Sequence, residues 1–300
     1  MTMVPVRARP SLALMLKEKR VTRAPYPFVS REVETRPLDF AGDERHCRRM
    51  LEPWLYPVLT AVAFCTGFID AIAGGGGLIM VPALLFAGIP PLHALGTNKA
   101  QSMCGTAVAC ANYARSGLFS WREHRWTVAL VFVGAAAGVL VVQAIGSQSM
   151  GLVIPILLMA VALYVLLSPR MTDEDAQERI GDTAYKPLAG AIGFYDGFFG
   201  PGTGSFFTSS LVGLRGMGLT RATALTKLFN LTSNVASVIV FAIGGKILCL
   251  LSLCMALGAM AGGWAGSHSA MRFGARLIRP LLVILSLGLT ARLLWGYFSG

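Results

Sequence analysis

The sequence predicts an all-α polytopic membrane protein with two internal repeats of four or five membrane segments each, interrupted by short or broken helices at glycine clusters. Three observations predict this class. Hydrophobic residues make up 54% of the 300 residues, charged residues only 14%, and the mean hydropathy is +0.61. A soluble domain carries about 25% charged residues. Apolar runs long enough to span a bilayer recur along the chain, and motifs of the first half return in the second.

Ten apolar segments are the predicted membrane helices. They are 54–73, 77–90, 94–116, 126–146, 149–169, 187–200, 204–218, 222–244, 247–269 and 277–298. The segments 77–90, 187–200 and 204–218 are the shortest of them. At about 1.5 Å per residue they reach only ~21 Å, whereas the hydrocarbon core is ~30 Å thick. We therefore expect them to be broken or half-spanning helices.

The distribution of charge divides the chain into four parts. Residues 1–50 form a basic, polar N-terminal tail with eleven of the 26 Lys and Arg residues, and Met50 is an alternative start. This tail lacks the long apolar core of a secretory signal. Residues 51–169 are the first transmembrane repeat, 170–186 a charged cytoplasmic loop, and 187–300 the second repeat.

An internal duplication relates the two halves. A Gly-Phe-x-Asp motif, a glycine-rich run and a segment ending in lysine follow one another in the same order in each half. The matched pairs are 67–70 with 193–196, 74–77 with 200–204, and 94–99 with 222–227. A two-residue insertion is the only difference in spacing between the two sets.

The basic residues favour inverted repeats. Loop 115–125 carries three arginines, and its counterpart near 245 has only Lys246. The bias reverses in the other two pairs, where only the second half is basic. Because basic loops favour the cytoplasm, this reversal indicates that each half crosses the membrane an odd number of times. The alternative is four crossings plus a re-entrant turn per half, with parallel repeats, which leaves the arginines at 272–279 outside.

Four charged residues stand inside or beside apolar segments: Asp70, Lys99, Asp196 and Lys227. Each costs ~2.5–3.5 kcal/mol at the bilayer centre before it is paired. The lysines are therefore candidates for binding an anion, and the aspartates for carrying protons. The alternative for the aspartates is helix capping beside a glycine break.

The glycine clusters predict unwound backbone within the membrane, which is tolerated only where it is buried in protein or lines a wet cavity. A helix that begins at such a break directs free N–H groups and its positive dipole end into the cavity. With a lysine nearby, the expected guest is an anion. The alternative is close helix packing through small residues.

Polar stripes accompany both lysines, at 98, 101, 102 and 105 and at 223, 226, 227, 230 and 234. We expect these stripes either to line a substrate path or to join neighbouring helices by hydrogen bonds. The candidate substrate-binding residues are Gly76, Gly77, Thr97, Asn98, Lys99, Gln101, Gly202, Thr203, Gly204, Thr226, Lys227 and Asn230, and the candidate proton-coupling residues are Asp70 and Asp196.

Other function classes lack their signatures. The six cysteines form no C-x-x-C pair and the four histidines are scattered, so we expect no metal, no cofactor and no catalytic residue. Outside the N-terminal tail, the chain has no basic stripe with interleaved aromatic residues, the pattern that indicates nucleic-acid binding. The run 200–205 lacks the lysine of a phosphate-binding loop.

Several motifs together carry a family resemblance. They are Gly67-x-x-Asp70, Gly74–Gly77, Val81-Pro82-Ala83-Leu84, Ala94-Leu95-Gly96-Thr97-Asn98-Lys99, Arg115-Ser116-Gly117 and Trp121-Arg122. Over about 54–298, the chain resembles the TauE/SafE family of predicted sulfite and organosulfonate exporters, also called the 4-toluene sulfonate uptake permease family. The second half departs from the pattern, with Pro201 in place of a glycine and Leu225 before Thr226.

The resemblance implies transport of sulfur-containing anions. We therefore expect a multi-pass protein of the cell membrane (the inner membrane, if the source is a bacterium) that acts as a secondary, proton-coupled transporter of sulfite or sulfonates. An anion channel on the same scaffold is the alternative. The expected partners are a small anionic solute, a coupling ion and the lipid bilayer, and the sequence leaves the oligomeric state open.

Overall fold

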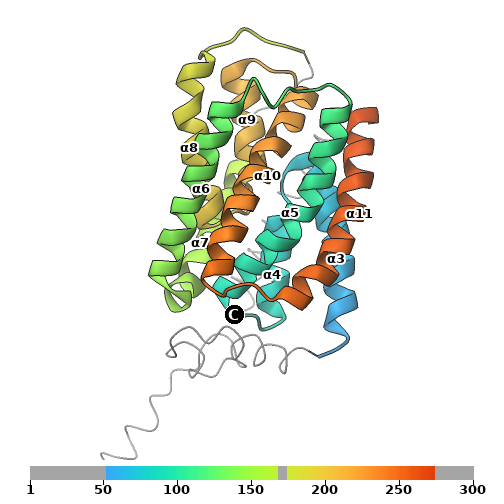
Figure 1. The fold of residues 1–300 in the computed structure, drawn as a ribbon, viewed down its shortest axis with the longest axis vertical. Coiled ribbons are helices and arrows are strands. Elements are labelled where there is room, and N and C mark those ends of the chain that lie inside the picture. Colours follow the sequence, from blue (N-terminus) through green and yellow to red (C-terminus); the bar gives the residue numbers. More distant parts are fainter. Residues whose placement is uncertain (1–51, 168–173, 274–300) are drawn as a thin grey trace, which may run out of the picture. The chain divides into compact units, whose positions relative to one another are not determined.

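The computed structural model describes residues 52–167 and 174–273, which belong to one compact unit of the chain. Within these ranges every regular element is a helix (Figure 1). The helices are α3 (Leu55–Ala73), α4 (Gly77–Phe86), α5 (Pro91–Arg115), α6 (Arg125–Ile145), α7 (Ser147–Leu167), α8 (Asp182–Phe198), α9 (Thr203–Arg215), α10 (Leu219–Ile243) and α11 (Cys249–Phe273). The all-helical prediction is confirmed for this part of the chain.

Nine of the ten predicted segments correspond to one helix each, and the tenth, 277–298, lies outside the described residues, as does the tail 1–50. The largest difference between a predicted and an observed helix boundary is at α8. This helix begins at Asp182, so it includes the end of the predicted loop 170–186. Lys186 Nζ lies 3.1 Å from Asp182 Oδ2 one turn away. Such an ion pair, with an acidic residue in the first turn, stabilises a helix start.

Four helices of the described part are long and apolar enough to cross a membrane: α3, α6, α10 and α11. The apolar α4 has only 10 residues, which corresponds to ~15 Å and half of a hydrocarbon core. Of the segments predicted to be short, 77–90 and 204–218 correspond to helices of 10 and 13 residues, whereas 187–200 belongs to the longer α8 of 17 residues.

The helices α3 and α4 form a hairpin that enters and leaves the bundle at one end. Leu59 of α3 and Leu84 of α4 belong to one apolar cluster with Ala94 of α5 and Leu251 of α11. The start of α3 therefore lies beside the end of α4.

The helices α8 and α9 form a second hairpin, which enters from the opposite end (Figure 1). Tyr185 near the start of α8 and Leu211 near the end of α9 share a cluster with Ala222 of α10. The opposite direction follows from α10, which starts in this cluster and ends with Phe241 against Gly96 in α5. The two glycine breaks are the tips of these hairpins.

Close packing through glycine occurs mainly between the hairpins and the long helices that cover them. The most extensive helix pairs are α3 with α11 and α6 with α8. On α11, a Cβ at Gly258, Gly262 or Gly266 would overlap a carbonyl oxygen of α3, and Gly138 of α6 is equally close to Phe194 of α8. Small residues at such crossings let helix backbones approach each other.

The crossing of α3 and α11 predicts a stability effect. Gly262→Ala places a methyl group on the carbonyl oxygen of Phe64, so the two helices must separate. We expect a loss of about 1–3 kcal/mol, the usual range for overpacking, measured as a lower melting temperature of the detergent-solubilised protein.

The matched control is Gly213→Ala on α9, where an added Cβ meets no atom within 4 Å. Because alanine is the better helix former, this variant should melt at or slightly above the wild-type temperature. Equal melting temperatures for the two variants would contradict the packing argument.

Candidate functional site

The tips of the two hairpins touch. Gly74, which ends α3, has φ 76°, and Gly200 and Gly202, which precede α9, have φ 93° and 85°, a left-handed backbone that favours glycine. A Cβ on Gly74 would lie 2.6 Å from the Cα of Gly204. The hydroxyl of Ser205 also donates to the Ala73 carbonyl at 3.5 Å. Both breaks therefore belong to one site.

The first ion pair joins α5 to the tip of the second hairpin. Lys99 Nζ lies 2.7 Å from Asp196 Oδ1, and the two side chains are 4% and 5% exposed. Asp196 stands in the last turn of α8, and the hydroxyl of Ser233 on α10 donates to its other oxygen, Oδ2. The lysine side chain lies directly against Gly200.

The second ion pair is the reciprocal of the first and joins α10 to the tip of the first hairpin. Lys227 Nζ lies 3.1 Å from Asp70 Oδ2 and also donates to the Asp70 carbonyl oxygen. The lysine side chain is fully buried, and that of Asp70 is 25% exposed. Since Asp70 is in the last turn of α3, the ammonium also meets the negative end of the helix dipole.

The aspartates do not cap the helices that follow them. The N-cap residues of α4 and α9 are Gly76 and Gly202, and neither helix has a side-chain cap. The capping alternative is therefore wrong. Each carboxylate instead balances an ammonium group that would otherwise be buried without a counter-charge, a situation that costs about 3–5 kcal/mol.

A central cavity of about 30 Å³ lies between the tips and the two long helices. Its lining residues are Asp70, Gly74, Gly77, Asn98, Lys99, Ser102, Asp196, Gly200, Gly202, Thr203, Gly204, Asn230 and Asn234. The volume is enough for about two water molecules. Gly77 and Thr203 are the first residues of α4 and α9, so both positive helix ends face the cavity. The buried Oδ1 of Asn230 has no hydrogen-bond partner among the described residues.

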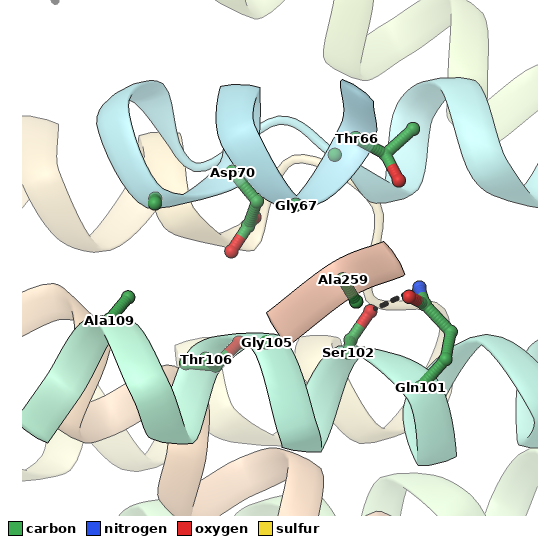
Figure 2. A pocket seen from close by; sticks show the side chains of 11 residues that line it. Thr66, Gly67, Asp70, Gln101, Ser102, Gly105, Thr106, Ala109 and Ala259 are labelled. Atoms are coloured by element: carbon green, nitrogen blue, oxygen red, sulfur yellow. Dashed lines mark hydrogen bonds between the residues drawn. The ribbon is translucent and has the colours of Figure 1, made fainter. Parts of the chain in front are cut away.

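A smaller side cavity of about 10 Å³ lies between α3, α5 and α11. Figure 2 shows Asp70 extending from α3 towards α5, where Ser102, Gly105 and Thr106 line the opposite wall. Gln101 donates to Ser102 at 2.9 Å and to Asn98 at 3.1 Å (Figure 2 shows the first of these bonds). Asp70 and Ser102 line both cavities, so these two residues lie between them.

The structure brings most of the candidate residues together. Those lining the central cavity are Asp70, Gly77, Asn98, Lys99, Asp196, Gly202, Thr203, Gly204 and Asn230, and those lining the side cavity include Gly76 and Gln101. Lys227 reaches the site through Asp70. Two candidates face elsewhere: Thr97 accepts a hydrogen bond from the Leu248 amide, and Thr226 bonds Thr208.

Sequence reasoning missed some members of the site. Gly74, Gly200, Ser102 and Asn234 line the central cavity, and Ser233 holds Asp196. The glycines belong to the noted clusters, and Ser102 and Asn234 lie on the polar stripes. Ser233 follows Asn230 by one helical turn, a spacing that could have placed it on the same stripe.

Comparison with known proteins identifies a family that this chain matches. The family model "Sulfite exporter TauE/SafE" matches residues 59–293. No solved structure matches the chain.

Curated relatives are similar over most of their length. A "probable membrane transporter protein YfcA" from Escherichia coli K12 is 41% identical over 82% of this chain and 92% of its own. "Probable membrane transporter protein ORF9" from a Sinorhizobium species is 45% identical over 80% of this chain and 92% of its own. A "probable membrane transporter protein" from Haemophilus influenzae is 42% identical over 81% and 97%. The chain is thus a multi-pass membrane protein and belongs to the TauE/SafE sulfite exporter family, whose members are transporters and not enzymes.

Proposed function

We propose that the chain is a proton-coupled secondary transporter of small sulfur-containing oxyanions such as sulfite and sulfonates, and that the central cavity is its binding site. The observation that carries the proposal is the pair of reciprocal contacts, Lys99 with Asp196 and Lys227 with Asp70. Charged side chains at membrane depth are expensive, and they usually mark the path of an ion or substrate.

An oxyanion fits the chemistry of this site. Each ammonium group is held by a carboxylate, which a second anion can replace. The amides of Asn98 and Asn230 line the same space and supply neutral hydrogen-bond donors. The first turns of α4 and α9 add backbone N–H groups and positive dipole ends.

Proton coupling follows from charge balance. An anion that takes an ammonium group from its aspartate leaves that carboxylate unpaired in the membrane. Binding one proton removes this charge, so the site stays neutral when a monovalent anion, such as hydrogen sulfite or a sulfonate, enters together with one proton. An anion without a proton would add a net negative charge to a buried site, which is far more costly.

The size of the central cavity favours a carrier over a channel. About 30 Å³ is too small for an oxyanion with its oxygen atoms, so the hairpin tips or the ion pairs must move before it binds. Such a rearrangement in every cycle is the property of a carrier.

The same contacts support inverted repeats. The two hairpins enter from opposite ends, and each half supplies the lysine that pairs with the aspartate of the other half. The long helix α11 covers the hairpin helix α3 as α6 covers α8. A two-fold axis in the membrane plane produces such an exchange, and transporters with this symmetry bind substrate where the repeats meet.

Removal of a complete ion pair tests the binding site. We expect the double variant Lys99→Gln/Asp196→Asn to fold, because no buried charge is left alone, and to lose at least tenfold in sulfite efflux from loaded proteoliposomes. The single variant Lys99→Gln should lose transport and also stability.

The matched control removes the pair Lys186–Asp182, whose side chains are 24% and 41% exposed. Surface pairs contribute little to stability, so the double variant Lys186→Gln/Asp182→Asn should transport normally. If the Lys99→Gln/Asp196→Asn protein shows wild-type efflux, the pair Lys99–Asp196 is not part of the transport mechanism.

A flux experiment separates the carrier from the channel. With radiolabelled sulfite in proteoliposomes, uptake by a carrier should saturate, accelerate when unlabelled sulfite is present on the other side, and respond to an imposed pH gradient. Single-channel currents, or a flux that stays linear with concentration, would support the channel instead.

The proposed inversion predicts which loops share a side. In a cysteine-free background, Ala87→Cys between α4 and α5 and Met217→Cys between α9 and α10 lie in corresponding loops of the two halves. We expect a membrane-impermeant maleimide to label them from opposite sides of the membrane. Labelling of both from one side would favour parallel repeats.

A further inference from the structure

The two pseudo-equivalent aspartates have different surroundings, and we infer that Asp70 alone exchanges the proton, through a one-water site in the side cavity. This inference rests on the proposed proton coupling and deepens it. Asp196 then acts as the fixed partner of Lys99.

The carboxylate of Asp196 has no free oxygen. Its Oδ1 lies 2.7 Å from Lys99 Nζ and its Oδ2 accepts a hydrogen bond from Ser233. The side chain is 5% exposed. A proton would therefore have to displace one of two close donors.

The carboxylate of Asp70 is more open. Its Oδ2 lies 3.1 Å from Lys227 Nζ, and its Oδ1 has no protein partner within the described ranges. The side chain is 25% exposed, and this exposure is towards the two cavities that it lines. One oxygen of Asp70 is thus available to a proton without loss of a protein hydrogen bond.

A single sequence difference between the halves accounts for this contrast. Gly105 and Ser233 each follow the lysine of their own helix by six residues, so they occupy the same place on α5 and α10. Ser233 binds Asp196, whereas Gly105 offers no side chain to Asp70 and lines the side cavity instead. A Cβ at Gly105 would lie 2.7 Å from the Ala259 carbonyl oxygen, so the packing of α11 keeps this position small.

The side cavity has the size and polarity of a water site. Its volume of about 10 Å³ is close to that of a single water. The hydroxyls of Ser102 and Thr106 line it together with Asp70, and the buried Oε1 of Gln101, another lining residue, has no partner among the described residues. Three or four polar partners are what a buried water requires.

The proton step balances in atoms and charge. A hydronium ion in the side cavity transfers one proton to Asp70 Oδ1, which forms an O–H bond and leaves a neutral water and a neutral carboxylic acid. Lys227 then has no counter-charge, and its ammonium group can bind an anion that enters the central cavity. Release of the anion returns Lys227 to Asp70, and the proton leaves to water.

The other charged and titratable groups around Asp70 agree with this order of events. They are Lys227 on α10, Lys99 and Tyr113 on α5, and Asp196 on α8. From α4, α9 and α11, only uncharged residues line the two cavities. Tyr113 donates its hydroxyl proton to the Ala71 carbonyl at 2.9 Å and is not directed at the carboxylate. The anion that then binds Lys227 replaces the negative charge that Asp70 has lost.

The test compares Asp70→Asn with the matched variant Asp196→Asn in proteoliposomes, using two measurements. Infrared difference spectroscopy follows the C=O stretch of protonated carboxyl groups as the pH is lowered. We expect a band that is lost in Asp70→Asn and retained in Asp196→Asn. A pH dye inside the vesicles follows proton movement during sulfite flux, and we expect Asp70→Asn to reduce the protons moved per sulfite at least tenfold.

The outcomes separate this inference from the proposed function. A band lost in Asp196→Asn and kept in Asp70→Asn would overturn the inference. If the band behaves as expected but sulfite moves no protons, the inference holds and the assigned coupling to sulfite fails.

A milder variant keeps the inference testable if Asp70→Asn does not fold. Thr106→Val keeps the side-chain shape but removes one polar partner from the side cavity. We expect it to shift the pH midpoint of the carboxyl band and to slow proton movement at least threefold. Thr232→Val, whose hydroxyl bonds the Leu228 carbonyl away from both cavities, is the control. Equal midpoints and rates for the two variants would overturn the water-site assignment.

Discussion

The arrangement of the described helices depends on one constraint: two lysines buried at membrane depth need counter-charges. Lys99 and Lys227 are almost completely inaccessible, and an unpaired ammonium there would cost several kcal/mol. Each counter-charge comes from the other half of the chain, so neither half can satisfy its own lysine. The two ion pairs therefore link the halves in addition to the apolar contacts around them.

The broken helices bring each counter-charge close to the N-terminus of the following helix. At each hairpin tip, the last turn of the first helix, which carries the aspartate, lies beside the first turn of the next helix. The tips can cross because Gly74 and Gly204 have no side chains where their backbones meet. The same breaks turn two helix N-termini towards the site. Positive dipole ends and ammonium groups thus surround a cavity whose resting charge is balanced by two carboxylates.

The helices and the charged residues of the site could be predicted from the sequence, but the residues with which those charged residues pair could not. Helix positions follow from local apolar composition, and Lys99 and Asp196 are recognisable because charge is anomalous in apolar segments. Their pairing joins residues from different halves, which no local pattern encodes. Thr97 and Thr226 were assigned to the site because a stripe identifies a face of a helix and not what that face contacts; the structure places Leu248 and Thr208 there. The start of α8 was misplaced because Asp182 and Lys186 resemble loop residues until their one-turn spacing is considered.

The two halves of the chain supply two similar lysine–aspartate pairs, and the proposed proton site rests on the differences between them. Two equally open carboxylates would let two protons enter with one monovalent anion, and the charges would no longer balance. Ser233 occupies the second oxygen of Asp196, while Gly105 leaves the corresponding oxygen of Asp70 exposed to a cavity. The serine adds a hydrogen bond to a charged group, and a proton on Asp196 would have to displace it or Lys99. The glycine is retained by an unrelated requirement, the close approach of α11. In the proposed mechanism, packing at Gly105 and hydrogen bonding at Ser233 thus restrict proton exchange to one of the two pairs.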